Sequence, residues 1–172
     1  MEGGRLNVMK LVKLVYLLDR LSIARRGIPV VGGVYFSMKN GPVTGELLDL
    51  INAGKLANDP DSSWEEFISD RDSHDVVLRT EPPLDFLSES EIHLIGEVYR
   101  EHGGKDQWAI RDWCHQHCGE WTPLQSGRSS IMLEEIARNV GKSEIEVRRI
   151  SEEAEESNLL NRAFSPSRLI HG

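Results

Sequence analysis

Hydrophobic spacing predicts one buried helix near the start of the chain. Asn7 fits the N-cap position, and the apolar positions of residues 8–26 cover most of the circumference of a helix, which is typical of a central, buried helix. Gly27, followed by Pro29, predicts the end of this helix. The apolar positions are Val8, Leu11, Val12, Leu14, Val15, Leu18 and Leu21.

Short strands and a turn are predicted in the next segment. Residues 34–38 are rich in β-branched and aromatic side chains, which predicts a strand. Residues 74–79 alternate weakly and predict a second strand that could pair with the first. The turn over residues 40–42 predicts the start of a helix, with Pro42 near its first position.

Capping patterns predict the remaining helices. A Ser or Asp at the N-cap satisfies free N–H groups of the first turn, and a Glu three residues later completes a capping box. We expect residues 120–130 to form a loop and the end of the chain to fray. The expected helices are a short turn around Trp64 opened by Ser63 and Glu66, a helix to about residue 102 opened by Ser88 and Glu91, one from Asp106 to about residue 118, a short one over residues 133–140, and one to about residue 160 opened by Ser143 and Glu146.

These elements predict a mainly α (α+β) fold, a compact helical domain with a small two- or three-stranded β element. We expect residues 1–160 to form a single domain and residues 161–172 to form a flexible C-terminal tail. A chain of 172 residues is long enough to bury a core without a disulfide or a structural metal.

The charge balance narrows the classes of partner. The chain has a formal net charge of −8 and a pI of about 5.3. Nucleic acid and anionic membranes are poor partners for such a chain, because both attract lysine and arginine, whereas a basic protein partner is allowed. The polar first residues and the lack of a long apolar segment predict a cytoplasmic protein without a signal peptide or a membrane helix.

Cys114, His115, His117 and Cys118 are the residues most similar to a reactive cluster. A structural zinc site draws two ligand pairs from separate elements, and the sequence has no second Cys or His pair. A Cys–His nucleophile also needs an orienting third group and an oxyanion hole, and only the pairing is visible. We therefore expect no cofactor, no metal and no catalytic residue, and we interpret the chain as a protein-binding module rather than an enzyme.

Residues 133–160 have the order and spacing of elements of a helix-turn-helix, with Gly141 in the turn and Val147 and Ile150 packing inward. The charges of residues 141–160 oppose DNA binding, because glutamates outnumber the basic side chains there. A plain αα-hairpin is the simpler interpretation, and a DNA-binding transcriptional regulator is the alternative function.

Four short motifs resemble one family in their order and spacing. In this chain they are Lys10-Leu11-Val12-Lys13-Leu14-Val15-Tyr16, Lys39-Asn40-Gly41-Pro42-Val43, Leu87-Ser88-Glu89-Ser90-Glu91 and His117-Cys118-Gly119-Glu120-Trp121. They resemble the K-L-x-K-L-x-Y, G-P-V, L-S-x-x-E and His-x-x-Glu-Trp segments of the Panacea domain, the SocA-like antitoxin family. The resemblance covers about residues 10–150.

The resemblance implies an antitoxin of a bacterial or phage toxin–antitoxin system, which neutralises a cognate protein toxin encoded by a neighbouring gene by binding it directly. It also implies a proteolytic-adaptor variant, in which the domain delivers the toxin to a AAA+ protease. It provides no catalytic residues. Exposed aromatic side chains are typical interface anchors, and together with polar residues of the motifs they give the candidate partner-binding set of Tyr35, Lys39, Asn40, Trp64, His117, Glu120 and Trp121.

Overall fold

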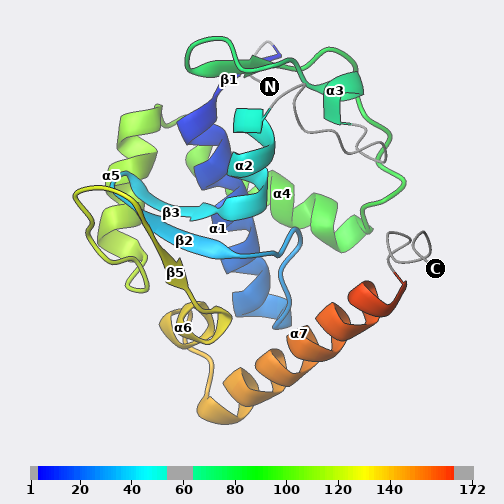
Figure 1. Cartoon of the computed structure of the whole chain (residues 1–172), viewed down its shortest axis with the longest axis vertical. Coiled ribbons are helices and arrows are strands. Elements are labelled where there is room, and N and C mark those ends of the chain that lie inside the picture. Colours follow the sequence, from blue (N-terminus) through cyan, green and yellow to red (C-terminus); the bar gives the residue numbers. More distant parts are fainter. Residues whose placement is uncertain (1–3, 54–63, 165–172) are drawn as a thin grey trace, which may run out of the picture.

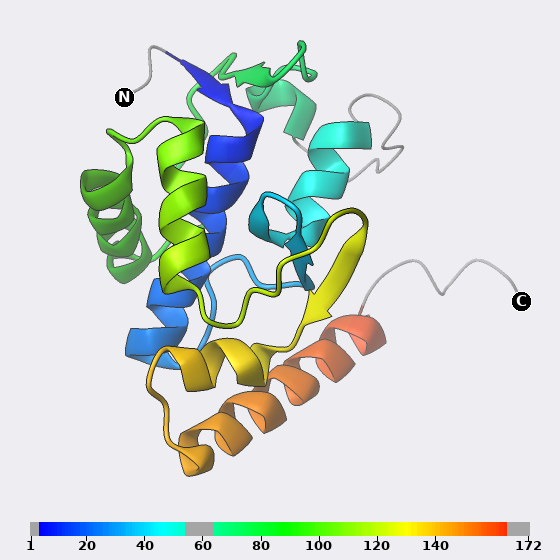
Figure 2. The ribbon, with the colours of Figure 1, turned by 90° about the vertical axis from the view of Figure 1, so that its left-hand side faces the viewer.

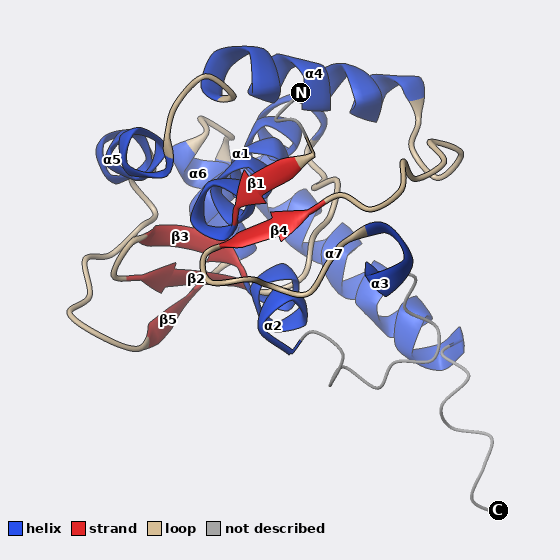
Figure 3. Cartoon of the chain, turned by 90° about the horizontal axis from the view of Figure 1, so that it is seen from above, coloured by secondary structure: helices blue, strands red, loops and turns tan. Residues whose placement is uncertain are grey.

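Helix α1 (Val8–Arg26) runs through the middle of the molecule (Figure 1). A computed structural model of the chain describes residues 4–53 and 64–164. In these ranges α4 (Glu89–His102) and α5 (Gln107–His117) pack against α1, and a three-stranded sheet lies against another side of it (Figure 3). The other helices are α2 (Gly45–Ala53), α3 (Trp64–Phe67), α6 (Leu133–Asn139) and α7 (Glu144–Phe164). This arrangement confirms the predicted fold class, mainly α with a small β element.

The helix starts predicted at Asn7, Ser88, Asp106 and Ser143 are confirmed, and each of these caps is a local contact. The Asn7 side-chain oxygen accepts hydrogen bonds from the backbone N–H groups of Met9 and Lys10 at the start of α1. At the start of α4, Ser88 and Glu91 form a capping box, in which the side chain of each accepts a hydrogen bond from the backbone N–H of the other. Asp106 caps α5 in the same way as Asn7 caps α1. Such side-chain acceptors satisfy N–H groups that have no partner within the helix.

Strand pairing differs from the prediction. Strand β4 (Asp75–Val77) pairs with β1 (Arg5–Asn7), so its predicted pairing with the strand near residues 34–38 is wrong. That strand, β2 (Tyr35–Met38), lies between β3 (Gly41–Thr44) and β5 (Arg128–Ile131), and both pairs are antiparallel. A strand pattern identifies the face that is buried, but the partner comes from distant parts of the chain.

The prediction that Pro42 opens a helix is also wrong. Pro42 lies in β3 opposite Ser37, and α2 begins only at Gly45. Strand β3 is an edge strand, where the missing N–H of proline is tolerated. Gly41, with φ of 100°, makes the tight turn of the β2–β3 hairpin.

Two predicted boundaries change. Strand β5 occupies part of the expected loop over residues 120–130 and reaches Ile131. Helix α7 continues beyond residue 160 to Phe164, so the first residues of the expected tail are helical. Residues 165–172 and Ser63, the expected cap of the turn around Trp64, lie outside the described residues.

The core extends from α1 to the last helix. The larger cluster of buried side chains joins residues of α1, α4, α5, β5, α6 and α7, and a smaller one joins α1 to β3, α2 and β4. Val147 and Ile150 are each 2% exposed, which confirms that they pack inward from α7. Helices α6 and α7 form a hairpin at one end of the molecule (Figure 2). Among the described residues, no helix is both long and apolar enough to cross a bilayer.

Candidate functional site

Helix α1 has a row of buried polar side chains within its apolar surface. They recur every three residues, at Lys10, Lys13, Tyr16 and Asp19, and each is less than a tenth exposed. Each side chain bonds to a segment that is distant in the sequence, so the row connects α1 to four different parts of the fold. The contacts are Lys10 Nζ to the Gly103 carbonyl (2.6 Å), Lys13 Nζ to the Pro42 carbonyl (2.7 Å), Tyr16 Oη to Glu120 Oε1 (2.6 Å), and the Asp19 carboxylate to the N–H groups of Val30, Val31 and Gly32 (2.7–2.9 Å).

Asp19 organises the segment that leads from α1 to β2. Its carboxylate accepts three backbone N–H groups, and it also accepts the Tyr35 hydroxyl at 2.9 Å. Burial and the neighbouring Asp19 charge raise the pKa of Tyr35, so its hydroxyl stays protonated and donates. Tyr35 is 3% exposed, which leaves it little surface to offer a partner.

Glu120 is the acceptor of a second buried network. Its Oε1 accepts from the Tyr16 hydroxyl and from Arg20 Nε, at 2.6 and 2.8 Å, and its side chain has no exposed area. Burial and Glu120 raise the pKa of Tyr16, which keeps this hydroxyl a donor. The network attaches the segment after α5 to α1, and Glu120 acts inside the domain.

Trp121, the next residue, supports the β2–β3 hairpin. Its indole Nε1 donates to the Met38 carbonyl at 2.9 Å. Its ring stacks on His115 with a centroid distance of 3.9 Å and an interplanar angle of 4°. On the other side of the hairpin, Lys13 bonds to the Pro42 carbonyl. The hairpin is thus held from both α1 and the segment after α5.

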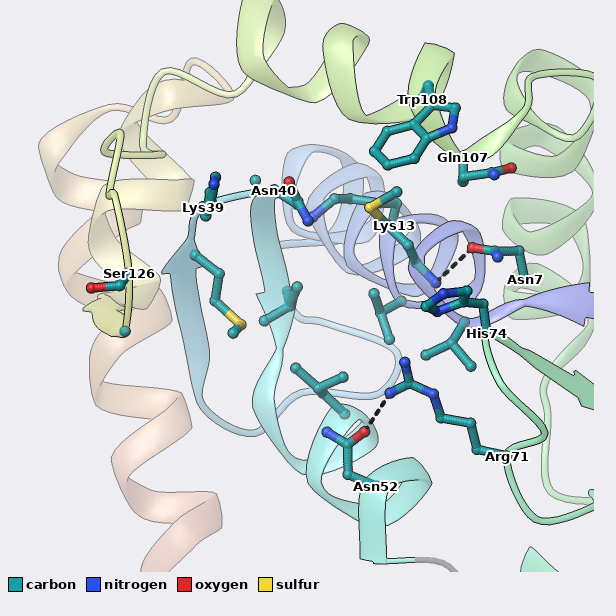
Figure 4. Close-up of a pocket in the computed structure, with 18 of the residues that line it drawn as sticks. Asn7, Lys13, Lys39, Asn40, Asn52, Arg71, His74, Gln107, Trp108 and Ser126 are labelled. Carbon is teal, nitrogen blue, oxygen red and sulfur yellow. Dashed lines mark hydrogen bonds between the residues drawn. The ribbon is translucent and has the colours of Figure 1, made fainter.

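A cleft of about 540 Å³ opens beside the tip of this hairpin (Figure 4). Its floor is apolar, from Val8, Val12, Val43 and Leu48. Six separate segments surround it, namely the start of α1, the hairpin, α2, the turn before β4, the start of α5 and the loop before β5. The polar and aromatic side chains around the cleft in Figure 4 are Asn7, Lys13, Lys39, Asn40, Asn52, Arg71, His74, Gln107, Trp108 and Ser126.

The positive charge of the cleft is local. Lys13, Lys39 and Arg71 line it, and none of the described residues that line it is Asp or Glu. Burial lowers the pKa of Lys13 to about 8, so most of its ammonium is still charged at neutral pH. A chain of net charge −8 therefore has one concave surface of the opposite sign.

Two of the seven candidate partner-binding residues, Lys39 and Asn40, line the cleft and are exposed. Trp121 lies behind the hairpin and supports it. His117 is exposed at the end of α5, where its ring stacks on Trp113 at 4.3 Å. Trp64 packs against the smaller core cluster and does not line the cleft. Tyr35 and Glu120 are buried, and partner contact by these residues stays a prediction.

The candidate residues predicted from the sequence do not include Lys13, Arg71 or Trp108 of the cleft. Burial of Lys13 could have been predicted from the sequence, because this lysine lies within a helix that is apolar on most sides. Trp108 is 50% exposed in the first turn of α5, two residues after the Asp106 cap, and its place in the first turn could have been predicted from the sequence. The place of Arg71 could not have been predicted in this way, since only the fold brings its turn to the cleft.

Cys114 and Cys118 are free thiols, and both are buried. A hydrogen bond to Cys114 and burial raise the pKa of Cys118, so Cys118 remains a thiol. The rings of His115 and His117 are both stacked on tryptophans. Within the described ranges, no group of three or more His, Cys, Asp or Glu side chains is placed to hold a metal ion.

Comparison with known proteins identifies the family. The family model described as antitoxin SocA-like, Panacea domain, matches residues 11–122, well over half of the chain. No curated protein and no solved structure gives a significant match. The matched range contains most of α1, the β2–β3 hairpin, α5 and the Glu120 network. The chain therefore belongs to the antitoxin SocA-like, Panacea-domain family, whose description suggests a role in a toxin–antitoxin system and implies a toxin as partner.

Proposed function

We propose that the chain neutralises a protein toxin by binding it directly, through the face that contains the hairpin cleft. The observation that supports this proposal is the composition of the cleft, in which an apolar floor lies beside the exposed Trp108 indole and the cations Lys39 and Arg71. Binding sites are typically concave and apolar with a few polar groups, and tryptophan and arginine are frequent interface anchors. The proposed activity is binding rather than catalysis.

The support of the hairpin favours tight binding. Lys13 and Trp121 fix the hairpin carbonyls from two sides, so the hairpin is ordered before a partner arrives. A surface that is already ordered loses less conformational entropy on association. A standard interface buries about 800 Å² of surface on each partner, which is more surface than the cleft alone provides. The exposed hairpin tip and the loop over residues 125–127 adjoin the cleft and would supply further contact area.

The test is growth of a bacterium that expresses the neighbouring open reading frame, with and without this chain. We expect the neighbour to stop growth, and the chain to restore growth and to co-purify with the toxin. Trp108→Ala should weaken the complex about tenfold or more. Ile145→Ala, which removes a side chain that is 83% exposed on α7, is the control and should leave the affinity unchanged. Rescue without a complex, or equal effects of the two variants, would contradict binding through this face.

Delivery of the toxin to a AAA+ protease gives a different result in the same cells. The toxin concentration would fall when the chain is co-expressed and would recover when the protease gene is deleted. Direct neutralisation instead leaves the toxin concentration unchanged and the toxin in the complex. Immunoblots of the toxin against time therefore separate the two mechanisms.

The alternative function, DNA binding by the α6–α7 hairpin, is opposed by its surface charges. The exposed side chains of α7 include five glutamates (Glu144, Glu152, Glu153, Glu155 and Glu156) and two arginines (Arg148 and Arg149). Such a helix is repelled by the phosphate backbone. A gel shift on the promoter of its own gene at low salt would test it, because electrostatic affinity is greatest there.

A further inference from the structure

Two of the three cations of the cleft, Lys13 and Arg71, are held in place by neutral groups. Lys13 donates to the Pro42 carbonyl, and Arg71 donates to the Asn52 amide oxygen and to the Ser73 carbonyl, each at 2.7–2.8 Å. Within the described ranges, neither cation has a carboxylate partner in an ion pair. These neutral contacts fix the positions of the charges and leave them uncompensated.

Two carboxylates on elements next to the cleft are already paired elsewhere. Asp75, next to His74 at the rim, bonds to Arg5 at 2.8 Å, and Asp49 of α2 bonds to Arg128 at 3.2 Å. The charge of the cleft is therefore not neutralised by these neighbours. A concave surface lined by charges of one sign without counter-charges favours a partner of the opposite sign, here an anionic one.

The polar groups of the cleft fit a peptide better than a phosphate ester. Phosphate is typically bound by free backbone N–H groups at a helix start. Two helix starts reach this cleft, and both are occupied, because Asn7 accepts from Met9 N–H and Asp106 accepts from Trp108 N–H. The rim instead has side-chain amides, which match the N–H and C=O groups of a peptide backbone. The amide of Asn7 is used by the α1 cap and by Asp75, and the other amides belong to Asn40, Asn52, Gln107 and Gln125.

We propose that the cleft takes an acidic segment of the toxin, with carboxylates paired to Lys39 and Arg71 (Figure 4) and an apolar side chain against the buried lining residues Val12 and Val43. This inference rests on the proposed function and names the chemistry of the partner at that site. It also reverses the expectation from net charge, because an acidic chain then recognises an acidic segment through one local basic surface.

The first test uses a phage-displayed library of random peptides, selected on the full-length chain. We expect the selected peptides to be enriched in Asp and Glu next to an apolar residue. Their dissociation constants should rise about tenfold or more in the Lys39→Glu, Arg71→Glu double variant. The Arg148→Glu, Arg149→Glu variant makes the same change of charge on α7, outside the cleft, and should change affinity less than twofold. Neutral or basic selected peptides, or equal losses in the two variants, would overturn the inference.

The second test separates this inference from the proposed function. In the growth assay, failure of the unmodified chain to rescue would overturn neutralisation itself. Rescue by the chain and equally by the Lys39→Glu, Arg71→Glu variant would leave neutralisation in place and overturn the acidic segment. Thermal stabilisation by ATP or pyrophosphate that depends on Lys39 and Arg71, without peptide binding, would assign the cleft to a phosphorylated ligand and would also overturn it.

Discussion

At the scale of single residues, Lys13 is a cation buried against neutral groups. It is 1% exposed, and burial lowers its pKa from 10.5 to about 8. The unfolded chain retains the ordinary value, so between these two pH values the unfolded state binds more protons than the folded state. The free energy of unfolding therefore rises with pH in this window. The destabilisation is complete below about pH 8 and disappears as the pH passes about 10.5.

Replacement of Lys13 by methionine tests this sign. Each unit of pKa shift corresponds to about 1.4 kcal/mol, so the stability of Lys13→Met relative to the unmodified chain should fall by about 2–3 kcal/mol between about pH 7 and pH 10. Urea unfolding of both proteins across this range measures the difference, in which other titrating groups cancel. Ile145→Ala, which removes an exposed side chain that does not titrate, is the control and should show a flat difference. A flat difference for Lys13→Met would mean that Lys13 is not buried as a cation.

A substitution of Glu120 can show whether this residue stabilises the fold or contacts the toxin. Glu120→Gln keeps the shape but removes the charge that accepts from Tyr16 and Arg20, so we expect the free energy of unfolding to fall by about 1–3 kcal/mol. Toxin affinity, measured where both proteins are folded, should not change. Glu152→Gln, at an exposed position of α7, should alter neither quantity. Weaker binding with unchanged stability would instead restore Glu120 as a contact residue.

Sequence reasoning located part of the site because part of the site is local. The exposed hairpin tip, Lys39 and Asn40, follows from a turn sequence and was predicted. Tyr35 and Glu120 were chosen as polar or aromatic motif residues, but their hydroxyl and carboxylate bond inside the fold. Whether such a side chain faces inward depends on partners about 16 to 104 residues away, which no local pattern encodes.

At the scale of elements, the helices were predictable and the strand pairs were not. Caps such as Asn7 and Ser88 act within three residues, so the sequence contains the whole contact. Strand β2 instead pairs with β5, whose residues lie ninety or more positions after their partners in the sequence. The short β5 segment has no apolar alternation, since only Ile131 of its four residues is buried. Residues 128–131 therefore form a strand because they pair with the edge of β2 that β3 does not occupy.

The β2–β3 hairpin gives a prediction at the same scale. Gly41 has φ of 100°, and an added Cβ would lie 3.0 Å from Lys13 Nζ. Gly41→Ala should therefore lower the free energy of unfolding by about 1–3 kcal/mol. Gly96→Ala is the matched control, because Gly96 lies within α4 with nothing within 4 Å of an added Cβ. It should raise stability by about 0.5–1 kcal/mol. Equal effects of the two alanines in urea unfolding would contradict the hairpin geometry.

At the scale of the whole molecule, the core extends beyond the range that matches the family. Strand β5 completes the sheet on β2, and Ile136 of α6 is fully buried in the larger cluster. Ile150 of α7 packs near Gly27 at the end of α1, 3.4 Å from the position of a Cβ there. The elements after residue 122 thus cover an end of α1 that residues 11–122, the range matched by the family model, would leave uncovered.

Truncation of the chain tests this dependence. A chain that ends at Thr122 loses the buried side chains Ile131, Ile136, Val147 and Ile150. Each contributes about 1.5–3 kcal/mol when buried, and together they approach the total stability of a domain, about 5–15 kcal/mol. We expect this chain to lack a cooperative thermal transition in circular dichroism.

A chain that ends at Ser157 is the control for the truncation, because it keeps the four buried side chains and removes Leu159 and Leu160, which are exposed on α7. It should unfold cooperatively, close to the midpoint of the full chain. If the chain ending at Thr122 also unfolds cooperatively, then β5, α6 and α7 are an addition to a self-sufficient unit. In that case the cleft, whose loop over residues 125–127 would be missing, could be tested for toxin binding without that loop.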